Sequence, residues 1–299
     1  MTLRIGTSAS GGTFYTQGEA IVELLNRAGS AGEAKVVETK LASVDNANRL
    51  DAGEIEFGFM ASNWIGLAKD GSPPFVHKIS LRMASPTNSG PIFFTTLANS
   101  AIKTIPDLKG RRIAVGPKGS GMARHVHTIF NVLGILLSDF TPVYLDFPEG
   151  ADALVAGEID AQFQTPIPNA VMTDLSERAD LRVIPYAPGQ IDKILSEVSY
   201  YRKTTMKKGA LRGIVEDIPQ IAVVNVLVTH ERVAADSVHV VVKTMIDNSE
   251  TLARMNPLFK GLANLYEPLR LKGAAAFRMG GVSLHPGALR AYKEAGLIS

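Results

Sequence analysis

The same strand, glycine loop and helix occur twice in this chain, and that duplication constrains the fold more than any other feature of the sequence. Residues 3–6 form a short apolar strand ending in glycine, and a Ser/Gly-rich loop leads into a helix with apolar residues at helical spacing. Residues 112–116 form a second such strand, followed by a second such loop and helix. The pairs Ser10-Gly11 and Ser120-Gly121 hold equivalent places in the two loops.

Each copy continues with the same second half. Residues 50–56 and 154–160 both end a helix at a glycine, Gly53 or Gly157, and lead directly into another strand. The expected strands of the two copies are 3–6, 35–38 and 57–61, and 112–116, 142–145 and 161–164. Each copy is therefore a βαβαβ unit, which predicts an α/β fold with a mostly parallel sheet in each unit and helices on both faces.

Two such units predict two lobes. We expect a discontinuous first lobe made of residues 1–92 and 222–299, because the helical stretch from Val233 onward has an apolar face that needs a core. Residues 93–221 form the second lobe, and apolar segments near 91–97 and 221–229 are the candidate hinges. The alternative is two independent domains on one linker, but no Pro/Ser/Gly-rich linker is visible.

Composition narrows the possible functions. The chain has 299 residues and a formal net charge of +2, without a basic tail, which disfavours a nucleic-acid partner. Cysteine is absent, so thiolate chemistry and disulfides are excluded. No apolar run is long enough to span a bilayer, and no signal-peptide pattern precedes the first strand. We therefore expect either a cytosolic protein or a mature form whose signal has been replaced.

The two Ser-Gly loops are the first candidate binding elements. In open α/β sheets, ligands bind beyond the carboxyl ends of the strands, and a helix that begins there offers unpaired N–H groups and a partial positive charge. The candidate contacts of these loops are Ser10, Gly11, Gly12 and Thr13, and Gly119, Ser120 and Gly121. A small organic anion is the expected ligand. The alternative is that Ser10 or Thr13, and Ser120, only cap their helices.

Other strand-end loops supply further candidates. Ser43 opens a helix of the first unit, and a loop with Asn63 and Trp64 is expected after its third strand. Gln164 ends the equivalent strand of the second unit, and Thr165 and Pro166 follow it. Trp64 is either an aromatic at the rim of the site or a lid on the core. The segment 200–203 brings phenols and cations either to the hinge or to an exposed helix end.

The residues needed for other kinds of chemistry are missing. His125 and His127 are two apart on a predicted helix, so they face different directions and do not form a metal pair. No Gly-x-Ser-x-Gly nucleophile motif and no nucleotide-binding glycine motif occurs. We expect no catalytic residue, no metal and no cofactor, and hence no enzyme.

The chain resembles the TAXI solute receptors of TRAP transporters over essentially its whole length. The matching segments are 5–15 (Ile-Gly-Thr-Ser-Ala-Ser-Gly-Gly-Thr-Phe-Tyr), 43–46 (Ser-Val-Asp-Asn), 52–54, 107–116, 119–121, 153–161 and 284–288 (Leu-His-Pro-Gly-Ala). The opening segment and the His-Pro-Gly ending are the most specific of these.

The resemblance implies a two-lobed periplasmic-binding-protein (Venus-flytrap) fold and a secreted or periplasmic receptor. Such a receptor is a monomer that delivers glutamate or a related dicarboxylate to the membrane subunits of a TRAP transporter. It also implies ligand contacts in the two Ser-Gly loops and at Tyr15. Two departures point to a bulkier or less polar acid: Met122 replaces a Thr common in the family, and residues 163–168 replace a smaller Ala/Gly-rich loop.

Two other functions remain open at this point. An enzyme on the same two-lobed fold would turn over its acid, and a cytosolic sensor domain would need no signal peptide. The sensor hypothesis lacks a DNA-binding helix-turn-helix or other output module in the sequence.

Overall fold

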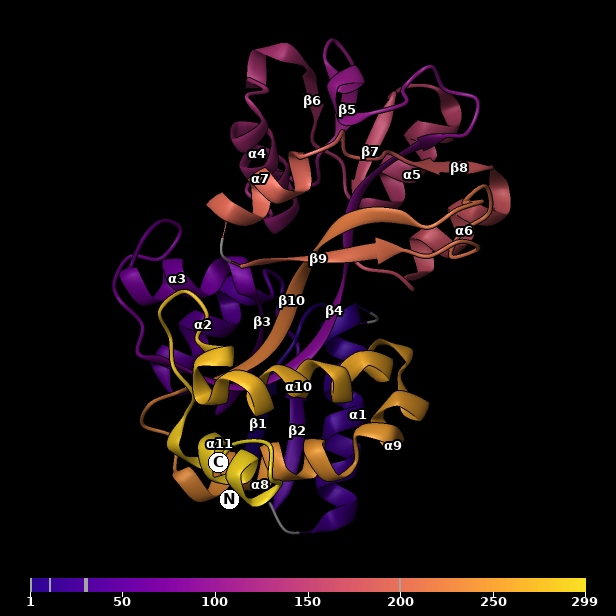
Figure 1. Ribbon diagram of the computed structural model, residues 1–299. Helices are drawn as coiled ribbons and strands as arrows, with labels where there is room; N and C mark the ends of the chain where they lie inside the picture. Colours follow the sequence, from indigo (N-terminus) through magenta and orange to yellow (C-terminus); the bar gives the residue numbers. More distant parts are fainter. Residues whose placement is uncertain (1, 11, 30–31, 199) are drawn as a thin grey trace. The chain divides into compact units, whose positions relative to one another are not determined.

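The computed structural model describes residues 2–10, 12–29, 32–198 and 200–299, and its elements are labelled in Figure 1. The chain divides into two compact units. Unit 1 comprises residues 1–89 and 224–299, and unit 2 comprises residues 90–223. The boundaries between the units fall inside two long strands, β4 (Leu81–Leu97) and β10 (Ile218–His230).

The sheet of unit 1 is built on β1 (Thr2–Gly6). β2 (Glu33–Val37) and β3 (Phe57–Ala61) flank β1 and run parallel to it, as expected for a βαβαβ unit. β10 pairs with β3 in the antiparallel direction, with Leu227 opposite Phe59. The sheet is therefore mixed, and its parallel part ends at one common carboxyl edge.

Helices cover both faces of this sheet. α1 (Thr13–Ala28) packs on one face, where Phe14 stacks on Phe59 with ring centroids 5.2 Å apart. α2 (Ser43–Ala52) and α3 (Ser62–Asp70) belong to the other face, where Trp64 and Ile65 pack with Met60 in a second core. Gly53 ends α2 in the left-handed conformation, as the sequence predicts.

The C-terminal helices complete the core of unit 1 beside β1 and α1 (Figure 1). They are α8 (Ala235–Asp247), α9 (Ser249–Met255), α10 (Leu262–Lys272) and α11 (Pro286–Glu294). Val241, Met245 and Leu252 of the predicted apolar face are completely buried there. His285 caps α11 by accepting the N–H of Gly287 at 3.1 Å, so the His-Pro-Gly motif has a structural role in starting this helix.

Unit 2 repeats the parallel arrangement around β5 (Arg112–Ala114). β6 (Thr141–Val143) and β7 (Ala161–Gln164) flank β5 in parallel. β4 then pairs with β7 and with β8 (Leu181–Val183) in the antiparallel direction, and β9 (Tyr201–Met206) pairs with β10.

Helices again lie on both faces of the sheet in unit 2. α4 (Gly121–Leu133) and α7 (Gln190–Glu197) lie together, and Phe130 of α4 stacks on Phe94 of β4 at 5.1 Å. α5 (Phe147–Ala156) and α6 (Ala170–Arg178) form another core with Phe93 and Leu181. These observations confirm the predicted α/β class, although the antiparallel strands make each sheet mixed. Among the described residues, no helix combines the length and apolar character needed to cross a membrane.

Candidate functional site

The first Ser-Gly loop joins the carboxyl end of β1 to the start of α1. Gly12 is the residue before the helix, and Thr13 is its first residue. Ser10 and Thr13 are exposed, and Tyr15 is half-buried. Gly11, also expected to contact the ligand, lies outside the described residues. Four of the predicted contacts therefore lie in this loop and in the first turn of α1.

A different serine makes the side-chain hydrogen bond at this helix. Ser8 Oγ accepts the N–H of Tyr15 at 3.2 Å, whereas the capping alternative assigned this role to Ser10 or Thr13. A Cβ atom on Gly12 would lie 2.5 Å from Ser8 Oγ and 2.9 Å from the Ala9 carbonyl oxygen, so only glycine fits this turn. Gly12 itself offers no side chain to the first N–H groups, which have no partner inside the helix.

The second loop is equivalent in position but capped differently. Ser120 Oγ accepts the N–H of Ala123 at 3.2 Å, so Ser120 caps α4. Gly119 has a positive φ of 78°, whereas Gly121 is the first residue of the helix. Met122 is only 8% exposed and packs inward. The hydroxyl proton of Ser120 is not used by this bond and remains available to an acceptor.

A hydrogen-bond network fixes the carboxyl edge of the sheet in unit 1. Asn46 Nδ2 donates to the carbonyl oxygens of Thr7 (2.8 Å) and Phe59 (2.9 Å), and Thr39 Oγ1 bonds to Thr7 O at 2.8 Å. Ser43, a predicted contact, is buried and its Oγ accepts the N–H of Ala61 at 3.1 Å. The network ties the ends of β1, β2 and β3 together, and the starts of α1, α2 and α3 adjoin this edge.

Asn63 and Trp64 do not lie in a loop as predicted. α3 begins at Ser62, directly after β3, so both residues are in its first turn. Trp64 is 6% exposed and its ring meets Phe75 edge-on at 6.4 Å. Trp64 is therefore part of the core, which agrees with the lid alternative and not with a rim aromatic.

Three buried carboxamides stand out by their lack of partners. Gln17 on α1 and Gln164 at the end of β7 are 0% exposed, and Asn63 is 4% exposed. Neither the oxygen nor the nitrogen of any of these amides has a hydrogen-bond partner within the described part of the chain. Asn63 and Gln164 were predicted contacts, whereas Gln17 was not. More than nine in ten buried polar groups in proteins are hydrogen-bonded, so each of these amides needs an explanation.

The loop after β7 contributes a largely apolar surface to unit 2. Pro166 is buried, and Thr165 is half-buried. Ile167 and Pro168 line a cavity of about 350 Å³ together with Met172, Met206 and other residues of unit 2. Residues 166–168 are thus less polar than Gln164, which ends β7.

A phenol and imidazole cluster in unit 2 includes Tyr186, which the sequence did not single out. His125 Nδ1 lies 2.6 Å from the Tyr201 hydroxyl, and the two rings are 5.5 Å apart. Tyr201 is buried on β9, so the segment 200–203 is not an exposed helix end. The hydroxyl of Tyr186 is buried without a hydrogen-bond partner among the described residues.

Burial sets the protonation of this cluster. It lowers the pKa of His125 to about 3, with a smaller effect from the nearby Arg124 guanidinium. Burial also raises the pKa values of Tyr186 and Tyr201. The imidazole and both phenols are consequently neutral at neutral pH, and the phenols keep their protons as hydrogen-bond donors.

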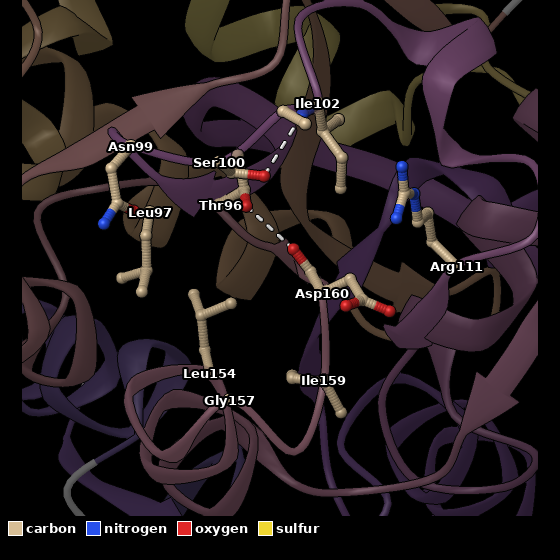
Figure 2. A pocket seen from close by; sticks show the side chains of 11 residues that line it. Thr96, Leu97, Asn99, Ser100, Ile102, Arg111, Leu154, Gly157, Ile159 and Asp160 are labelled. Carbon is tan, nitrogen blue, oxygen red and sulfur yellow. Dashed lines mark hydrogen bonds between the residues drawn. The ribbon is translucent and has the colours of Figure 1, made fainter.

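A further cavity in unit 2 lies at the opposite edge of the sheet (Figure 2). Its volume is about 180 Å³, and it adjoins the amino ends of β5 and β7. Two of its polar groups are already paired: Thr96 Oγ1 donates to the Asp160 carbonyl oxygen at 2.7 Å, and the Asp160 carboxylate accepts three bonds from Arg112. This cavity lacks the unsatisfied groups found at the carboxyl edge, and we do not consider it the primary site.

Comparison with protein-family models finds a match over almost the whole chain. The model of the NMT1-like family matches residues 5–296.

Solved structures with a similar fold include periplasmic binding proteins. The sulfonate-binding protein SsuA from Methylobacillus flagellatus is 18% identical, with a TM-score of 0.53, covering 99% of this chain and 95% of its own. The aliphatic sulphonate-binding protein SsuA from Escherichia coli is 17% identical, with a TM-score of 0.50 and coverages of 98% and 82%. A structure from work on glutathione import through GshT and the cystine importer TcyBC of Streptococcus mutans is 12% identical, with a TM-score of 0.52 and coverages of 88% and 95%. At these identities the likeness establishes the fold.

Proposed function

Because the chain belongs to the NMT1-like family and has the fold of periplasmic solute-binding proteins, we propose that it is an extracytoplasmic solute receptor. It captures a small organic anion and delivers it to the membrane subunits of a transporter. It binds the solute reversibly and does not convert it, which agrees with the absence of a nucleophile motif from the sequence.

The observation that carries this proposal is the duplication of one binding element. In each unit, a strand of the parallel sheet ends in a loop with glycine and serine, and that loop opens a helix. The first N–H groups of such a helix have no partner inside it and attract negative charge. Two elements of this kind support a solute that both units hold, with 91–97 and 221–229 as hinges.

We propose a carboxylate as the acid group, following the resemblance of the loops to those of TAXI receptors. The solved proteins of this fold include receptors for sulfonates, another class of organic anion. Both groups present oxygens to N–H and O–H donors, so the shared chemistry is an acid group at a helix N-terminus.

We propose a TRAP transporter as the partner, because the opening segment 5–15 and the ending 284–288 resemble that class of receptor. An ABC importer is the second candidate, favoured by the solved proteins of the same fold that are described as parts of ABC systems. Uptake assays in vesicles that contain the membrane subunits separate the two. An ion gradient drives uptake without ATP for the first, whereas ATP hydrolysis is required for the second.

Matched acids and amides test the binding proposal. We expect succinate, glutarate or a related acid to raise the melting temperature, with a gain of about 2.7 kcal/mol at a hundredfold excess over the dissociation constant. The corresponding amides, succinamide and glutaramide, keep the size but lose the charge and should give much smaller shifts. The measurement is a thermal-shift series followed by calorimetry on the best acid.

Two results would contradict the proposal. Equal shifts from an acid and its amide would show that the helix N-termini are not an anion site. The second is chemical conversion of the acid during incubation, detected by NMR of the recovered compound. That result would make the protein an enzyme and not a receptor.

A further inference from the structure

Gln17 is a polar residue in a position that normally holds an apolar one. It follows Phe14 by three residues and precedes Ile21 by four, so all three lie on one face of α1. Phe14 and Ile21 belong to the core of unit 1, and Phe14 stacks on Phe59 of β3. Gln17 therefore faces the sheet and not the solvent.

The neighbouring glycine shows how close this part of α1 comes to the carboxyl edge. A Cβ atom on Gly18 would lie only 2.5 Å from Cγ2 of Thr7, the residue that follows β1. The second turn of α1 is thus pressed against the point where β1 ends. Gln17 directly precedes Gly18 in α1, about one helical turn after Thr13, the first residue of the helix.

Burying a carboxamide without partners opposes folding. An unsatisfied buried donor or acceptor costs its full desolvation, and Gln17 leaves both its oxygen and its nitrogen unsatisfied in the described structure. Asn46 shows what a structural amide looks like in the same unit. Its nitrogen makes two bonds to carbonyl oxygens, and its oxygen lies 3.2 Å from Thr39 Oγ1.

Asn63 shares the properties of Gln17. It is buried in the first turn of α3, and neither of its amide atoms has a partner among the residues that the structure describes. A carboxamide nitrogen donates two hydrogen bonds, whereas its oxygen only accepts them. An acid group can satisfy the nitrogens but has no proton for the oxygens when it is ionised.

We propose that Gln17 and Asn63 are solute-binding residues, and that the solute carries N–H or O–H donors in addition to its acid group. This inference rests on the proposed function and narrows its substrate class to hydroxy acids, amino acids or similarly substituted anions. The acid group binds to helix N–H groups, while the two amide oxygens accept bonds from the added donors. An acid with a plain hydrocarbon chain leaves those oxygens unsatisfied and binds more weakly.

The first arm of the test measures the stability of the solute-free protein. Gln17→Met and Asn63→Leu keep the approximate shape of each side chain and remove the unsatisfied amide. We expect the melting temperature of each variant to stay the same or to rise. The matched control is Asn46→Leu, which breaks three contacts of a satisfied amide and should lower the melting temperature by about 4 °C or more.

The second arm measures preference within pairs of acids that differ in one donor group, a neutral hydroxyl in the first pair and an ammonium, which also adds a positive charge, in the other two. The probes are succinate and L-malate, glutarate and L-glutamate, and ethanesulfonate and taurine. We expect the wild type to bind the donor-bearing member of the best pair about tenfold more tightly. In Gln17→Met or Asn63→Leu that preference should fall to about twofold or less, a change that loss of a purely structural residue would not produce.

The outcomes separate this inference from the function on which it rests. If the plain acids bind as tightly as their partners, or if Gln17→Met destabilises as much as Asn46→Leu, the amides are structural and the inference is wrong. The receptor function survives that result. If none of the six acids binds the wild type, the proposed function itself fails.

Discussion

His125 and Tyr201 show how burial fixes the charge of individual residues in unit 2. The imidazole is 5% exposed and bonded to a phenol that is 2% exposed. Because burial lowers the pKa of His125 to about 3, the folded protein holds this histidine neutral at pH values where an unfolded chain protonates it.

A pH dependence of stability follows from this pair. Above about pH 6.5 the histidine is neutral in the folded and in the unfolded protein, so its protonation does not affect the free energy of unfolding. As the pH falls from about 6.5 toward 3, only the unfolded state gains the proton, and the free energy of unfolding falls by up to about 1.4 kcal/mol per pH unit. Between pH 7.5 and pH 5, we expect the free energy of unfolding to fall by about 2 kcal/mol less in His125→Gln than in the wild type.

Urea unfolding at the two pH values measures this difference. His230 and His285, whose pKa values burial also lowers, remain in both proteins and cancel in the comparison. Identical losses in the wild type and in His125→Gln would show that His125 is protonated in the folded state and that the pair is not neutral.

Single residues of the site were predicted from the sequence to different degrees. Asn63 and Gln164 were selected because they lie near strand ends, and the structure shows both side chains buried with no hydrogen-bond partner among the residues it describes. Gln17 was missed, although its position between Phe14 and Ile21 on an apolar helix face was a usable signal. Tyr186 gave no such signal, because its burial depends on contacts between segments far apart in the chain.

At the scale of elements, the two Ser-Gly loops use their serines differently. Ser120 caps α4 through the N–H of Ala123, whereas Ser10 is exposed and Ser8 bonds to α1 in its place. Equivalent positions in the repeat therefore have different structural roles. This allows capping and solute binding to be separated by experiment.

We expect Ser120→Ala to lower the free energy of unfolding of the solute-free protein by about 1 kcal/mol, because it removes a cap. Ser10→Ala should change that free energy by less than about 0.5 kcal/mol, since its side chain is exposed. Both variants should weaken binding of the best acid by about tenfold to a hundredfold, the value of one hydrogen bond to a charged group. Denaturant unfolding and calorimetry give the two quantities.

One result would contradict the proposal that both loops bind the solute. If Ser120→Ala loses stability but keeps its affinity, the second loop is only a helix cap. Ser8→Ala serves as the control for the first loop, because it removes a bond to α1 at a residue outside the predicted contacts.

Most elements were predictable because the same sequence pattern occurs in both copies of the repeat, so each copy supported the prediction for the other. The strands before Gly6 and Gly116, and the helix ends at Gly53 and Gly157, occur in the structure where they were expected. α3 was missed because Ser62 starts a helix directly after β3 without any turn residue. The antiparallel strands β8 and β9 were missed because short strands between turns carry little periodicity.

At the scale of the whole molecule, the chain forms two units and crosses between them twice. β4 is continuous over Leu81–Leu97 and β10 over Ile218–His230, and each contains a boundary between the units. The sequence identified apolar segments here but not the full length of the strands, because residues 85–91 of β4 (Ser-Pro-Thr-Asn-Ser-Gly-Pro) have the composition of a turn and Pro219 lies near the start of β10. We propose that these strands bend when solute binds.

Closure of the two units on the solute is the proposed action of this receptor, and small-angle scattering tests it most directly. The radius of gyration should be compared without solute and with the best-binding acid at saturation, using the matched amide at the same concentration as the control. We predict that the radius of gyration falls with the acid and stays constant with the amide, as expected for hinge closure around a ligand. An unchanged radius of gyration at saturating acid would contradict the proposal that the two units close on the solute.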